Sequence, residues 1–100
     1  MRAAYEDELR ALASRLGHAA EMADWPGVEE ADAQCQPLVE AAIAGLDQDP
    51  AQAPRVAEAL AVLLAAQRRA ERLCAQARDA LAAEIRALDR GQRVSAAYGV

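Results

Sequence analysis

Residues 54–90 run PRVAEALAVLLAAQRRAERLCAQARDALAAEIRALDR, and this stretch decides the fold. Mostly apolar residues recur in it at alternating spacings of four and three, from Val56 through Leu63 and Leu81 to Leu88, with no glycine before Gly91. This spacing keeps the residues on one face of an α-helix. We therefore expect one long helix over about residues 54–90, followed by a flexible tail over residues 91–100.

Two shorter helices precede the long one. The spacing of Tyr5, Leu9, Leu12 and Leu16 predicts a helix over about residues 2–23. Asp24 then has the character of an N-cap, so a second helix is expected over about residues 25–45, with a kink near residues 33–36 caused by the proline at position 37. The link between these two helices is very short, which favours antiparallel packing.

The sequence thus predicts an all-α fold, an antiparallel helical hairpin packed on one long third helix (a three-helix bundle), as a single domain over residues 1–100. Composition agrees, because 28 of the 100 residues are alanine and none is phenylalanine. At a rise of 1.5 Å per residue, the third helix is expected to extend about 20 Å beyond the hairpin.

The overhanging part carries exposed apolar residues at helical spacing. Leu81, Ile85 and Leu88 cannot be covered by straight helices of the hairpin, and such exposed stripes usually mark an interface. We expect a partner to bind there, with Val62 and Leu73 flanking the stripe. Two alternatives remain: the helix breaks and folds back, or the tail covers the stripe.

Arginines gather on the opposite face of the third helix. A helical wheel places Arg86, Arg90 and Arg93 within about 60° of Arg68 and Arg72. This basic ridge is either a solvated helix face or a docking surface for an acidic partner.

Charge and hydropathy exclude several classes of function. The formal charge of −5 and the pI near 4.8 argue against binding to nucleic acid or to an anionic membrane. The start MRAAYEDELR is charged and acidic, unlike a signal peptide, so we expect a cytoplasmic protein.

The residues that could carry chemistry are few. Neither Ser14 nor Met22, four residues before and after His18, would join it as a metal ligand. Cys35 and Cys74 are expected about 13 Å apart along the bundle, too far for a disulfide. We expect both thiols to be buried as small hydrophobic groups. Neither serine has a plausible base beside it, so neither an enzyme nor a bound cofactor or metal is expected.

Two segments resemble a known family. Residues 20–40, AEMADWPGVEEADAQCQPLVE, resemble flagellar export chaperones of the FliT type, in which an aspartate and a tryptophan open the second helix ahead of a glutamate-rich stretch. Residues 88–99, LDRGQRVSAAYG, resemble the terminal pattern of that family, a basic glycine-containing segment leading to Ala-Tyr-Gly. Pro37 departs from the pattern, because it stands where a helix former is expected.

The resemblance implies a function that the periodicity does not. It implies a cytoplasmic chaperone that binds the flagellar filament-cap protein, hands it to the export ATPase complex of the type III apparatus and, in some members, restrains the flagellar master regulator. The stripe would then contact the client, and the arginine ridge and Tyr98 would help with register or with the export machinery. The alternative is a homodimeric helical adaptor or regulatory protein unrelated to flagella.

Overall fold

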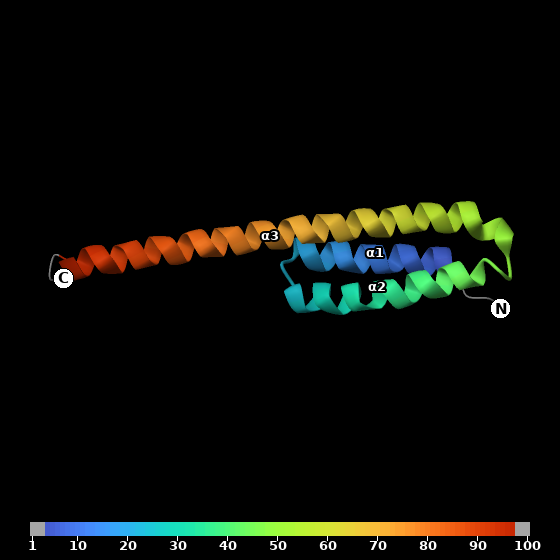
Figure 1. Ribbon diagram of the computed structural model, residues 1–100, viewed down its shortest axis with the longest axis horizontal. Coiled ribbons are helices and arrows are strands. Elements are labelled where there is room, and N and C mark those ends of the chain that lie inside the picture. The colour runs from blue at the N-terminus through green and yellow to red at the C-terminus, as the bar shows by residue number, and fades with distance from the viewer. Residues whose placement is uncertain (1–3, 98–100) are drawn as a thin grey trace.

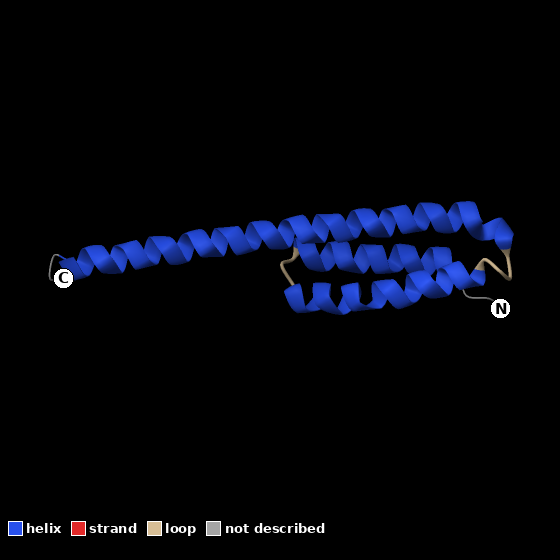
Figure 2. Cartoon of the chain, in the orientation of Figure 1, coloured by secondary structure: helices blue, strands red, loops and turns tan. Residues whose placement is uncertain are grey.

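The computed structural model describes residues 4–97, which form four helical elements. In chain order these are α1 (Tyr5–Glu21), α2 (Trp25–Gly45), the single 3-10 turn η1 (Pro50–Gln52) and α3 (Ala53–Ala97). The hairpin of α1 and α2 lies beside the first half of α3, and the second half of α3 projects beyond it alone (Figure 1). Short loops connect the helices (Figure 2). The predicted all-α hairpin on one long third helix is confirmed.

The first helix is shorter at both ends than the predicted range 2–23. Its N-cap is Ala4, and its last helical residue is Glu21. Ala23 has a φ of 56°, in the left-handed region that ends a helix, and the Asp24 N–H donates to the Ala19 carbonyl at 2.8 Å. The turn into α2 is therefore closed by backbone hydrogen bonds, as the very short link required.

The second helix spans the same residues, 25–45, as the predicted one. Asp24 is its N-cap, and its carboxylate accepts a hydrogen bond from the Gly27 N–H at 3.1 Å. Pro37 lies inside the helix, which runs on without a break but changes direction near its middle (Figure 1). A bend is the usual response to the missing hydrogen bond and the steric clash of an interior proline.

The third helix is longer than predicted, which corrects the expected end at residue 90 and the tail from residue 91. It continues through Gly91 as far as Ala97. One helical glycine costs only about 1 kcal/mol relative to alanine. An ion pair across Gly91, between Arg93 and Asp89 at 2.9 Å, offsets part of that cost.

The core runs along α1, which packs against both other helices while α2 and α3 touch each other little. Its largest fully buried side chains are Leu9, Leu12 and Leu16 of α1 and Leu63 of α3. On α3 the fully buried residues end at Ala70. The core therefore stops less than halfway along the 45-residue helix.

Candidate functional site

The hairpin ends on α3 near residue 73. Arg69 forms an ion pair with Glu21, the last residue of α1, at 2.8 Å, and Leu73 is half-buried against the core. We call residues 74–97 of α3 the overhang. At 1.5 Å per residue the overhang is about 36 Å long, against about 20 Å expected. Most of the difference arises because the helix continues past Gly91 to Ala97.

The overhang repeats the surface that α3 uses inside the bundle. Eighteen residues make five full turns of an α-helix, a shift of about 27 Å along the axis without rotation. Leu81 therefore points in the same direction as Leu63, and Leu88 in the same direction as Ala70, both of which the hairpin buries. The buried face of α3 thus continues beyond the hairpin as an exposed face.

The apolar side chains of this face are open to solvent. We call Leu81, Ile85 and Leu88 the overhang stripe; they are 57%, 57% and 69% exposed. Contiguous exposed apolar surface on a helix is typical of a protein interaction site. Within the described residues, α3 neither breaks nor folds back over the stripe (Figure 1).

The structure separates the other predicted contact residues. Leu73 directly precedes the overhang and is half-buried. Val62 is exposed beside the hairpin, about 28 Å from Leu81 along the helix axis. Tyr98 lies outside the described residues.

The arginine ridge is exposed along its whole length. Its members lie on the side of α3 away from the stripe, and all five are open to solvent: Arg68, Arg72, Arg86, Arg90 and Arg93. Within the described part of the chain, Arg93 is the ridge residue with an ion pair, to Asp89. The ridge is therefore available to an acidic surface.

The two cysteines differ, which corrects the expectation that both are buried. Cys35 is buried in the bundle, where its thiol donates to the Ala31 carbonyl at 3.5 Å. Burial raises the pKa of Cys35, the charge of Asp32 adds to this, and a hydrogen bond with Gln67 acts in the opposite direction. Cys74 is exposed, because the hairpin that would cover it has already ended.

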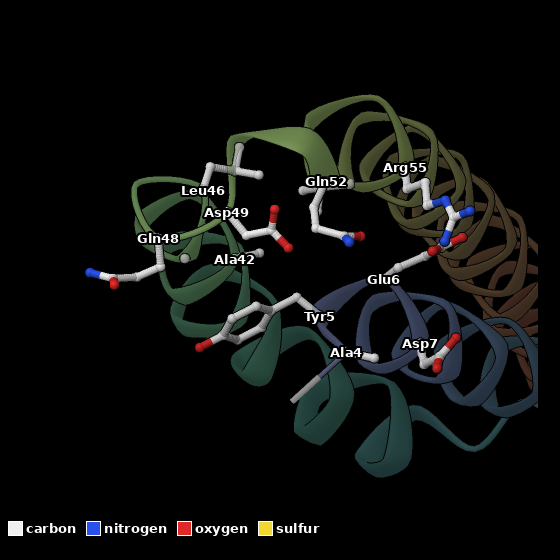
Figure 3. Close-up of a pocket in the computed structure, with 12 residues that line it drawn as sticks. Ala4, Tyr5, Glu6, Asp7, Ala42, Leu46, Gln48, Asp49, Gln52 and Arg55 are labelled. Atoms are coloured by element: carbon white, nitrogen blue, oxygen red, sulfur yellow. The ribbon is translucent and has the colours of Figure 1, made fainter. Parts of the chain in front are cut away.

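A hollow of about 560 Å³ opens at the opposite end of the bundle, where α1 begins and α2 ends (Figure 3). The Tyr5 ring and the Asp49 carboxylate lie on one side of it, and Gln52 and Arg55 on the other (Figure 3). The ring covers Gly45, where an added Cβ would lie 2.7 Å from Cε2 of Tyr5.

Sequence reasoning missed this hollow, because its walls come from three segments that only the fold brings together. The described residues that line it include no serine, cysteine or histidine, so it holds no Ser–His or Cys–His pair.

Two other kinds of feature are absent from residues 4–97. No cluster of three or more His, Cys, Asp or Glu side chains could hold a metal ion there. No helix in the same range combines the length and the apolar character needed to cross a membrane.

Fold and surface together define an all-α helical bundle whose third helix carries an exposed apolar face. The chain belongs to the flagellar protein FliT family, whose family model matches residues 3–100. This is a family of flagellar export chaperones and not an enzyme family, and it implies binding to flagellar export partners. Searches of curated proteins and of solved structures found no significant match.

Proposed function

We propose that the chain is a cytoplasmic chaperone that binds the flagellar filament-cap protein and delivers it to the export ATPase complex of the type III apparatus. The observation that carries the proposal is the overhang stripe. Leu81, Ile85 and Leu88 stand exposed on a helix face whose continuation is the core of the bundle. Family membership supplies the flagellar export context.

The proposed binding mode is a client helix laid along the overhang. An amphipathic helix in this place would bury the stripe as the hairpin buries Leu63 and Ala70. The overhang, about 36 Å long, accommodates a helix of about 24 residues. While bound, that client segment is shielded from other apolar surfaces.

The remaining predicted residues lie outside the overhang stripe and have separate proposed roles. Leu73 continues the stripe towards the bundle, and Val62 takes part only with a client that extends along the outside of the bundle. The exposed guanidinium groups of Arg86, Arg90 and Arg93 face away from the stripe, so they suit a second partner, the export ATPase complex or the flagellar master regulator. A role with the export machinery is also proposed for Tyr98, which lies outside the described residues.

The experiment is a binding measurement with the C-terminal segment of the filament-cap protein from the same organism. The variant carrying Leu81→Glu and Ile85→Glu should lose binding, because two carboxylates would be desolvated in the interface. Ile43→Glu is the matched control: Ile43 is 54% exposed, close to the value for the two stripe residues, but lies on α2. Undiminished binding by a folded double variant would contradict the proposal.

The alternative, a homodimer formed through the same stripe, is tested by the same variants. Light scattering at several concentrations measures the mass of the free protein. A dimer that the double substitution dissociates, and that does not bind the cap segment, would favour an adaptor function.

A further inference from the structure

Two carboxylates lie at the edges of the overhang stripe: Glu84 on one side, and Asp89, four residues after Ile85, on the other. Glu84 is three residues after Leu81 and four before Leu88, so the three side chains are neighbours on the helix surface. Eighteen residues earlier, and therefore on the same face, is Ala66, which is half-buried and packs against the core. Glu84 thus occupies the helix position that, inside the bundle, is half-buried against the core.

The helix itself offers Glu84 no countercharge. The residues three and four positions away on either side are Ala80, Leu81, Ala87 and Leu88. Among residues 4–97, no basic side chain lies within ion-pair distance of the Glu84 carboxylate. By contrast, Asp89 on the same overhang is paired with Arg93. Glu84 is exposed to solvent, and residues 4–97 offer its carboxylate no cation to replace that solvent.

A helix that docks on the stripe would remove this solvent. A carboxylate taken out of water without a cation or several hydrogen-bond donors is strongly unfavourable, whereas a close charge pair restores the lost interactions. We infer that Glu84 is a specificity residue of the proposed client site and that its occupant is an amphipathic helix with an arginine or lysine at the edge of its apolar face. This inference rests on the proposed function and adds the chemistry of the partner.

The direction in which Glu84→Ala changes the binding affinity distinguishes a specificity residue from a carboxylate that the interface only tolerates. If a basic client residue pairs with Glu84, Glu84→Ala weakens binding of the filament-cap segment by about tenfold or more, because the client cation is then buried alone. Without such a residue, Glu84→Ala strengthens binding, since the interface no longer desolvates a lone charge. The helix should tolerate the change, because Glu84 is exposed and alanine is the strongest helix former.

Asp79→Ala is the matched control. It removes the same charge five residues away, and Asp79 points about 140° from Glu84 around the helix, away from the stripe. Its effect on binding should stay below about twofold at physiological ionic strength, where exposed charges are screened within about 8 Å.

Charge reversal completes the experiment. Glu84→Arg should abolish binding, and changing one basic residue of the cap segment to glutamate should restore it. If the parent protein binds the segment and Glu84→Ala strengthens or does not change that binding, the inference is wrong and the proposed function stands. If the parent protein does not bind the segment at all, the proposed function is wrong and the inference about its client fails with it.

Discussion

Leu63 and Leu81 point in the same direction on α3, yet the structure gives them opposite consequences when they are truncated. They are the same residue type, eighteen positions apart and so five helical turns apart. Leu63 is 2% exposed, whereas Leu81 is 57% exposed. Truncation of each to alanine therefore compares a covered part with an uncovered part of one continuous helix face.

The magnitudes follow from these exposures. Removing a fully buried leucine side chain costs about 2–5 kcal/mol, so Leu63→Ala should lower the melting temperature by roughly 10–25 °C. Leu81→Ala should change the free energy of unfolding by less than about 0.5 kcal/mol. In client binding the order reverses. Complete burial of a leucine is worth about 1.5–3 kcal/mol, and about half of that is still available at Leu81, so the affinity should fall roughly four- to twelvefold.

The assay pairs thermal unfolding, followed by far-UV circular dichroism, with calorimetric titration of the filament-cap segment at a temperature where both variants are folded. If Leu81→Ala lowers stability as much as Leu63→Ala, then another part of the protein or a second copy covers the stripe, and the reasoning from the overhang is refuted. If a folded Leu81→Ala protein binds the segment as tightly as the parent, the client binds elsewhere.

Three further outcomes follow from single positions. Gly91→Ala should raise the melting temperature, because nothing lies within 4 Å of an added Cβ and alanine is about 1 kcal/mol more favourable than glycine in a helix. Gly45→Ala should lower the melting temperature, because its Cβ would lie 2.7 Å from the Tyr5 ring. Equal shifts in melting temperature would contradict the packing around Gly45. Pro37→Ala should stabilise the protein against urea by about 1–3 kcal/mol, because an interior proline removes one helical hydrogen bond; the absence of any gain would contradict this prediction. At neutral pH one thiol per chain, that of Cys74, should react rapidly with a thiol reagent, and the cap segment should slow this reaction. Mass spectrometry after digestion identifies the labelled cysteine, and fast labelling of both thiols would show that the bundle opens readily.

Much of the candidate site could be predicted from the sequence, because it depends on length and periodicity. The spacing of Leu81, Ile85 and Leu88 places them on one helix face wherever the helix lies. The difference in length between the third helix and the hairpin leaves that face uncovered. Neither inference needs side-chain packing.

The end of α3 could not be predicted in this way. A glycine followed by polar residues is a usual stop signal, and the sequence does not show whether helix formers and an ion pair across Gly91 outweigh it. The burial of Cys74 was mispredicted for a related reason, since a position on an apolar stripe is buried only where a neighbouring helix reaches it.

The sequence by itself determined the helical class, the antiparallel hairpin and the direction in which each side chain of α3 points, because these follow from local propensity, a very short turn and the 3.6-residue period. Only the tertiary structure decided how much of α3 the hairpin covers, and hence that Leu63 belongs to the core while Leu81 belongs to the surface. It also brought the start of α1 and the end of α2 together around the Tyr5 ring. The physical reason is that burial depends on which helices meet, and that depends on contacts between residues far apart in the chain.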